Sequence, residues 1–177
     1  MRIILKEFRR EEYDKLISWI KSKEFIVQWA GPIFEYPLTE EQLNNYRNGM
    51  LTNPPMRKIY SVFKTETDEH IGHIELNNID RQNNAAKICR VLIGEQYTGK
   101  GYGKEIVKAI IKIGFEELEL HRIDLGVFDF NTSAVKCYES VGFVHEGGSR
   151  EARKVDNEYW NLLQMSMLKK EYEKKYL

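Results

Sequence analysis

Residues 93–104 read Ile-Gly-Glu-Gln-Tyr-Thr-Gly-Lys-Gly-Tyr-Gly-Lys, a glycine-rich turn between an apolar run ending at Ile93 and a long amphipathic stretch. Glycine lets backbone N–H groups turn toward an anion with no Cβ in the way. The start of a following helix adds unpaired donors and the positive end of its dipole. The stretch therefore predicts a strand, a phosphate-binding loop and a helix, and with them a phosphorylated ligand.

Two common phosphate loops match this stretch only in part. The nucleoside triphosphatase pattern G-x-x-x-x-G-K-[ST] runs from Gly94 to Lys100, but Gly101 stands where a hydroxyl should bind magnesium. The dinucleotide pattern G-x-G-x-x-G begins at Gly99 but has Lys104 in place of its last glycine. An enzyme of nucleoside triphosphates is therefore kept only as an alternative.

Length and composition favour one domain, residues 1–177, that binds neither nucleic acid nor a membrane. The 177 residues are enough to bury a core, and 27 basic residues balance 27 acidic ones. Cys89 and Cys137 lack C-x-x-C spacing, so we expect reduced thiols and no metal site. The early charged residues and the lack of an apolar run of about 18 residues predict a cytoplasmic protein.

The apolar periodicity predicts a mixed α/β fold. Strands are expected at residues 2–8, 58–64, 71–76, 85–93, 122–128, 143–146 and 159–168, and helices at 11–22, 39–49, 131–140 and from the glycine loop to about 118. Residues 25–37 are expected to be irregular. Short connections imply an antiparallel meander, and the helical crossover to the strand containing Ile123 makes that strand parallel. The sheet should be mixed and mostly antiparallel, with helices flanking it.

A second motif follows the loop. Residues 131–143 read Asn-x-x-Ala-x-x-x-Tyr-Glu-x-x-Gly-Phe, and helical spacing places Asn131 and Tyr138 on one face. Residues 98–103 are similar to the pyrophosphate loop [RQ]-x-x-G-x-[GA], with Thr98 in the first position. With both motifs, the chain resembles the GNAT N-acetyltransferases, in particular the branch of ribosomal-protein alanine and polyamine acetyltransferases.

The resemblance implies a GNAT-like fold and acetyl-CoA as the cofactor, with CoA as the product. The implied cofactor-binding residues are Val91, Leu92, Ile93, Gly99, Lys100, Gly101, Tyr102, Gly103, Lys104 and Asn131. Tyr138 is implied as the acid that protonates the departing CoA thiolate, and a phenol with a pKa of about 10 suits that role.

The base and the acceptor pocket are less clearly marked. The glutamate that several GNAT enzymes carry on the strand before the loop is replaced by Lys87. Glu75 shares a strand face with His73 and is the expected replacement, with His73 as the second choice. Trp29 and Glu35 lie where the family builds its acceptor pocket, and Glu35 is expected to attract a cationic amine.

The predicted function is transfer of an acetyl group from acetyl-CoA to a primary amine by direct attack, without a metal. The acceptor is a small molecule, such as an amino acid or polyamine, or a protein N-terminus. An α-amino group with a pKa of about 7.7–8.0 loses its proton at low cost, which favours amino-acid or N-terminal amines. A non-catalytic acyl-CoA-binding or sensing module is the alternative, and a homodimer is one option for assembly.

Overall fold

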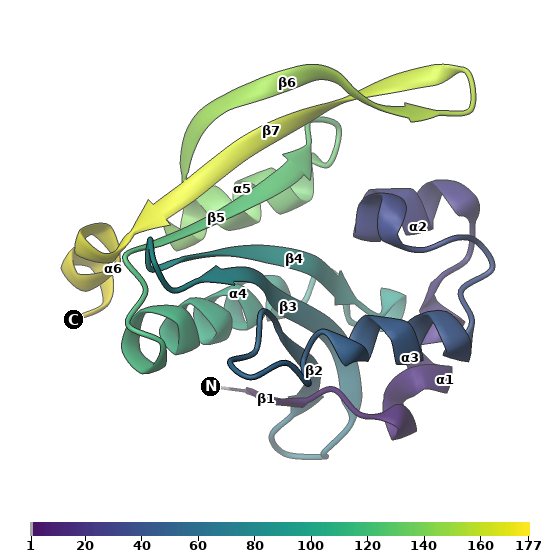
Figure 1. Ribbon diagram of the computed structural model, residues 1–177, viewed down its shortest axis with the longest axis horizontal. Helices are drawn as coiled ribbons and strands as arrows, with labels where there is room; N and C mark the ends of the chain where they lie inside the picture. The colour runs from purple at the N-terminus through teal and green to yellow at the C-terminus, as the bar shows by residue number, and fades with distance from the viewer. Residues whose placement is uncertain (1) are drawn as a thin grey trace.

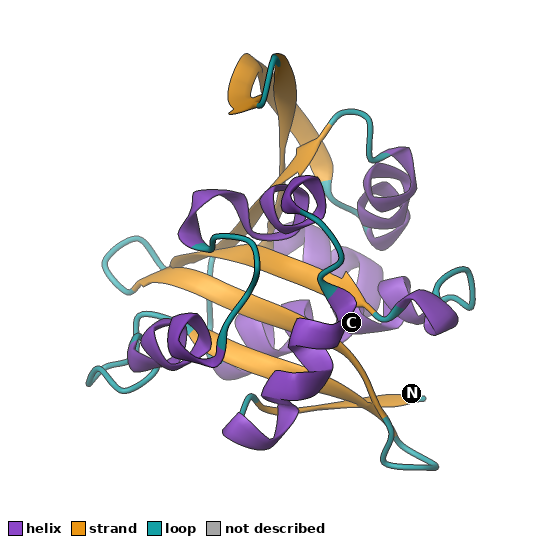
Figure 2. Cartoon of the chain, turned by 90° about the vertical axis from the view of Figure 1, so that its right-hand side faces the viewer, coloured by secondary structure: helices purple, strands orange, loops and turns teal. Residues whose placement is uncertain are grey.

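The computed structural model describes residues 2–177 as a seven-stranded sheet with helices on both faces (Figures 1 and 2). The strands are β1 (Ile3–Glu7), β2 (Lys58–Lys64), β3 (His70–Asp80), β4 (Ala85–Ile93), β5 (Arg122–Phe128), β6 (Val144–Val155) and β7 (Glu158–Leu168). Their order is β1-β2-β3-β4-β5-β7-β6, and every neighbouring pair is antiparallel except β4 and β5. The predicted mixed sheet, with its parallel strand at Ile123, is confirmed.

Each face of the sheet has its own apolar core. The longer helices are α1 (Tyr13–Trp19), α2 (Lys23–Ala30), α3 (Glu40–Asn48), α4 (Tyr102–Lys112), α5 (Thr132–Val141) and α6 (Lys169–Tyr176). Ile106, Ile110 and Ile123 are fully buried in the core that contains residues of α4 and α5. Phe8, Leu43 and Ile59 are fully buried in the core that contains residues of α1, α2 and α3. None of the helices within residues 2–177 is long and apolar enough to cross a membrane.

Several elements differ from the sequence prediction, and three of them differ most. Residues 25–37 are not irregular throughout, because α2 runs to Ala30 and the Ser22 side chain caps it by accepting a bond from Phe25 N at 3.2 Å. The predicted strand at residues 143–146 is the start of β6, which extends to Val155 and forms a long ribbon with β7 (Figure 1). Helix α6 follows β7 directly and was not predicted.

A β-bulge in β4 reorients the second half of the strand. The register steps from His73↔Leu92 to Glu75↔Cys89, so β4 holds one extra residue, and Arg90 has a φ of 52°. A bulge of this kind changes which face the following side chains reach. Ile88 accordingly belongs to the core beneath α4, whereas Leu92 belongs to the core beneath α1, α2 and α3.

The parallel pair β4–β5 is short. Its register runs from Ala85↔Arg122 to Ile88↔Leu125 and goes no further. Beyond this point the edge of β4 that faces β5 has no strand partner among residues 2–177, which leaves backbone N–H and C=O groups within residues 89–93 available to another extended chain.

Candidate active site

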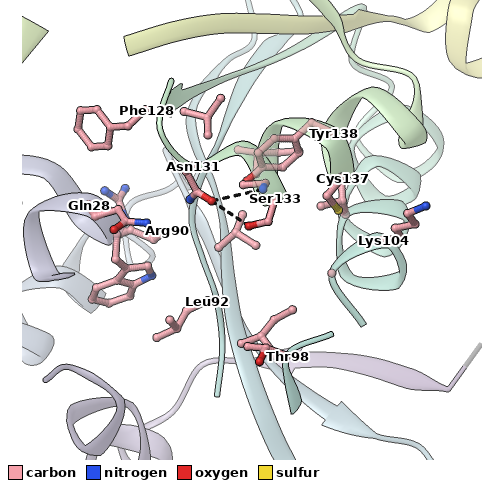
Figure 3. Close-up of a pocket in the computed structure, with 18 of the residues that line it drawn as sticks. Gln28, Arg90, Leu92, Thr98, Lys104, Phe128, Asn131, Ser133, Cys137 and Tyr138 are labelled. Carbon is pink, nitrogen blue, oxygen red and sulfur yellow. Dashed lines mark hydrogen bonds between the residues drawn. The ribbon is translucent and has the colours of Figure 1, made fainter. Parts of the chain in front are cut away.

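A cavity of about 510 Å³ opens where β4 and β5 separate (Figure 3). The second half of β4 lines one side of it, and the start of α5 lines the other. The glycine loop and the start of α4 lie at one end. The parallel crossover thus brings together the two sequence motifs, which are about 30 residues apart in the chain.

The glycine loop has the backbone geometry of an anion site. Gly99 and Gly101 have φ angles of 72° and 84°, in the left-handed region where a side chain adds strain. Gly101 is the N-cap of α4, and no side chain among the described residues caps this helix start. A Cβ on Gly103 would lie 3.4 Å from Cys137 Sγ, so glycine also permits the close approach of α4 and α5. The first N–H groups of α4 therefore face the cavity unblocked by side chains.

Asn131 and Tyr138 enter the cavity from α5 (Figure 3). Asn131 caps the helix, because its Oδ1 accepts bonds from Ala134 N at 3.3 Å and Ser133 Oγ at 3.1 Å. The Tyr138 side chain is 8% exposed and packs edge-on against Phe143. Burial raises the pKa of the Tyr138 phenol above its usual value, and the neighbouring Cys137 and Cys89 thiols raise it further. Tyr138 is therefore a protonated donor across the physiological pH range.

Most of the predicted cofactor residues line this cavity. They are Val91, Leu92, Ile93, Gly99, Gly101, Gly103, Lys104 and Asn131. The side chains of two others are directed elsewhere. Lys100 Nζ donates to Gln96 O at 2.7 Å, and the Tyr102 ring lies under the guanidinium of Arg2 at 4.8 Å.

Glu75, the predicted base, does not line the cavity. Its carboxylate is fully buried in β3, where it accepts a hydrogen bond from Arg90 Nε and another from Tyr46 Oη at 2.6 Å. Burial is the largest influence on the pKa of Arg90 and lowers it, but the hydrogen bond to Glu75 and the charge interactions with Tyr46, Glu75 and Cys89 together outweigh burial, so the pKa is raised. Glu75 is thus occupied as the partner of a buried cation.

His73 is equally enclosed. Its Nε2 lies 3.2 Å from Tyr46 Oη, and since the single Tyr46 proton goes to Glu75, Nε2 is the donor. Burial lowers the pKa of His73 well below its usual value, with Arg90 adding to the effect. The imidazole is therefore neutral and held within the core.

The two predicted acceptor-pocket residues, Trp29 and Glu35, lie in different places in the structure. Trp29 is 9% exposed, lines the cavity, and stacks on Phe34 with ring centroids 5.6 Å apart. Its buried Nε1 has no hydrogen-bond partner in the described part of the chain. Glu35 is exposed in the loop before α3, where its backbone N donates to Gln42 Oε1 at 2.8 Å, and it lines neither cavity.

A second cavity of about 280 Å³ adjoins the first. It lies among α2, the start of the β4–β5 gap and the β6–β7 ribbon, with Lys87, Arg90, Arg153 and Leu162 in its lining. Lys23 of α2 pairs with Asp156 at the turn of the ribbon at 2.6 Å, which ties the two walls together. The ribbon ends above α2 in Figure 1. Among residues 2–177, no cluster of three or more His, Cys, Asp and Glu side chains is placed to hold a metal.

Arg90, Phe128 and Gln28 are among the cavity-lining residues that were not predicted from the sequence. Arg90 carried a signal, because it is a charge at an alternating position of the strand at residues 85–93 that is otherwise occupied by Ala86, Ile88 and Leu92. Phe128 and Gln28 carried none, since both are brought to the site by the separation of β4 from β5 and by the unpredicted helix α2 (Figure 3).

Comparison with known proteins gives a consistent family. Residues 2–144 match the acetyltransferase (GNAT) domain. The chain is 37% identical over 113 residues to an uncharacterized N-acetyltransferase, p20, of Bacillus licheniformis, covering 64% of this chain and 63% of that protein. It is 31% identical over 102 residues to spermidine N(1)-acetyltransferase of Vibrio cholerae serotype O1 (strain ATCC 39315 / El Tor Inaba N16961), covering 58% of each. These alignments thus span less than two thirds of each relative.

The fold is shared with a solved structure over nearly its whole length. The crystal structure of spermidine N-acetyltransferase from Vibrio cholerae, in complex with CoA and spermine, superposes with a TM-score of 0.84. The superposition covers 97% of this chain and 98% of that one. The two sequences are 24% identical, so the likeness is one of fold. With the domain match covering residues 2–144, the chain belongs to the GNAT acetyltransferase family.

Proposed function

We propose that this protein is an N-acetyltransferase that moves an acetyl group from acetyl-CoA to a primary amine. The observation that carries the proposal is the cavity between β4 and β5, which joins an uncapped, glycine-rich helix start to a buried, protonated tyrosine. A phosphate site and a proton donor at two points of one cavity are what a phosphorylated thioester with a thiolate leaving group requires.

The cofactor is proposed to lie along β4. Backbone N–H groups of Gly101, Gly103 and Lys104 bind the pyrophosphate, and the exposed Lys104 ammonium adds a positive charge. The pantetheine arm takes the place of the missing strand partner along residues 91–93. Asn131, held by its own capping bonds, orients the cofactor near Tyr138.

The reaction is proposed to proceed by direct attack of the neutral amine on the thioester carbon. The C–N bond forms as the C–S bond breaks, Tyr138 gives its proton to the departing sulfur, and the phenolate then regains a proton from water. No carboxylate lines either cavity within residues 2–177, so the amine proton leaves to water. Deprotonating the α-amine of a peptide N-terminus costs only about 1.0–1.4 kcal/mol at pH 7, which is small enough for water to act as the proton acceptor.

The test is release of CoA thiol from acetyl-CoA in the presence of single amines, with mass spectrometry of the acetylated product. Amine-dependent thiol release supports the proposal. Acetyl-CoA binding with no acetyl transfer to any amine would contradict it and favour the non-catalytic acyl-CoA-binding alternative.

Two finer expectations belong to the same proposal. A cytoplasmic location fits an acetyl-CoA-dependent reaction, and fractionation of cells that express the protein tests it. A homodimer is the proposed assembly, and light scattering of the purified chain tests it.

A further inference from the structure

The smaller cavity and the larger one meet at a common wall. Arg90 and Cys89 of β4, Gly126 and Phe128 of β5, and Trp29 of α2 line both. The larger cavity contains the glycine loop and Tyr138, and the smaller one does not. If acetyl-CoA fills the larger cavity, the smaller cavity is left for the acceptor amine, which then approaches the thioester from the other side. The inference below therefore rests on the proposed function.

Every charged side chain in the lining of the smaller cavity is basic. Lys87 and Arg90 come from β4, and Arg153 comes from β6. No aspartate or glutamate of the described chain lines either cavity. A polyamine carries several ammonium groups, of which only the attacking one is neutral, so it would enter this cavity without a carboxylate to receive it.

Two of the three cations already have partners. Arg90 is paired with the buried Glu75, and Lys87 Nζ lies 3.3 Å from Asp124 Oδ1. None of the ion pairs formed among residues 2–177 involves Arg153, whose side chain is half-buried. Arg153 thus carries the uncompensated positive charge of the cavity.

An interruption in the pairing of β6 with β7 brings Arg153 to the smaller cavity. The register of β6 with β7 is interrupted between Ser149 and Arg153, and within the interruption Glu151 has a φ of 51°. Such a bulge re-aims the side chains that follow it. The next residue, Lys154, is exposed, and its ammonium lies over the ring of Tyr159 at 5.9 Å. Lys154 does not line the cavity.

We infer that the acceptor is a small primary amine that also carries an anionic group, a carboxylate or a phosphate, which Arg153 binds. A guanidinium binds either anion by donating paired hydrogen bonds to its oxygens, and it does so best where water is partly excluded. The volume of about 280 Å³ lies at the lower end for ligand sites, which fits an amino acid or amino phosphate. This chain thus shares its fold with a spermidine N-acetyltransferase, but its smaller cavity is suited to an anionic acceptor rather than to a polycation.

The first experiment compares matched amines with the wild-type protein. Initial rates of thiol release are measured for amino acids and their primary amides, for O-phosphoethanolamine and ethanolamine, and for spermidine. The inference predicts a kcat/KM at least tenfold higher for an anionic member than for its neutral counterpart and for spermidine. The carboxylate and phosphate arms identify which anion is used. A higher kcat/KM for spermidine would overturn the inference and leave the acetyltransferase function standing.

The second experiment assigns the preference to Arg153. We compare the ratio of kcat/KM for the acid to that for its amide in wild type and in Arg153→Glu, so that differences in amine basicity cancel. The ratio should fall at least tenfold, mainly through KM, and activity toward spermidine should rise. A variant with a damaged fold would not gain activity toward spermidine. Lys154→Glu makes the same charge change one residue away and should leave the ratio within twofold.

Each remaining outcome has a definite meaning. An unchanged ratio in Arg153→Glu, or an equal fall in Lys154→Glu, would overturn the assignment to Arg153. Absence of acetyl transfer to every amine would overturn the proposed function itself, and acetyl-CoA binding measured on the same preparation shows whether the cofactor site is intact.

Discussion

Arg90 and Glu75, on neighbouring strands, form an ion pair that is almost closed to solvent, with side chains 6% and 0% exposed. The pair exists because the bulge in β4 sends Arg90 to the face where Tyr46 and Glu75 lie. Arg90 also lines both cavities, so Glu75 anchors a residue at their common wall. We therefore assign Glu75 a positioning role.

Replacing Glu75 should first affect stability. Glu75→Gln leaves the Arg90 cation buried without its counter-charge, and breaking such a pair costs roughly 3–5 kcal/mol. Urea denaturation should show a fall of this order in the free energy of unfolding. Glu139→Gln, which alters an exposed pair with His145, is the matched control and should change it by less than about 0.5 kcal/mol. Loss of turnover at unchanged stability would instead restore Glu75 as the base.

Replacing Tyr138 should affect the chemical step. Tyr138→Phe removes the proton donor and keeps the ring, so kcat should fall by about 10²–10⁴-fold while the Kd for acetyl-CoA changes less than threefold. Steady-state kinetics and calorimetry measure the two quantities. Tyr172→Phe is the control, because that hydroxyl bonds to Glu116 and lines neither cavity. Unchanged turnover in Tyr138→Phe would remove the acid role.

A side chain on the glycine loop should weaken cofactor binding. In Gly101→Ala the residue must keep a φ of 84°, at a strain of roughly 1–2 kcal/mol, or move the N–H groups that bind phosphate. The Kd for acetyl-CoA should rise about tenfold or more. Gly147→Ala places the same change at a φ of 137° in β6, away from both cavities, and should bind acetyl-CoA like wild type. Equal affinities in all three proteins would refute the loop assignment.

The pH dependence of the rate should follow the acceptor. Burial raises the pKa of Tyr138, so the acid stays protonated as pH rises and contributes no falling limb below about pH 10. The amine becomes reactive as it loses its proton, so kcat/KM should rise with pH and level off near the pKa of the amine. Profiles for two acceptors with different pKa values should be displaced by that difference. A common inflection for both would indicate a protein base.

Much of the fold could be predicted from apolar periodicity. Strands β2, β4 and β5 begin and end at the predicted residues, because each combines apolar alternation with clear turn signals. Helix α2 also has a signal in the sequence, because the apolar side chains of Phe25, Ile26 and Trp29 share one helix face after the capping Ser22. Only the first residues of β6 were predicted, because the rest of residues 144–155 is largely polar and exposed, and pairing with β7 forms that part of the strand.

Cavity-lining residues were predictable where the prediction depends only on the local backbone or on helical spacing. The glycine loop, Asn131 and Tyr138 belong to this group and line the larger cavity, and their roles stay predictions. The contacts of Glu75 could not be predicted, because they depend on one extra residue in β4 that no alternation pattern reveals. The basic cavity likewise depends on a tertiary meeting of α2, β4 and β6, which are far apart in the chain.

Calorimetric titration of the purified protein with acetyl-CoA, with magnesium-ATP as the parallel ligand, tests the cofactor assignment without presupposing an acceptor. We expect saturable acetyl-CoA binding near one per chain, weakened in Gly101→Ala, and no comparable response to magnesium-ATP. Binding of magnesium-ATP with no response to acetyl-CoA would contradict the cofactor assignment.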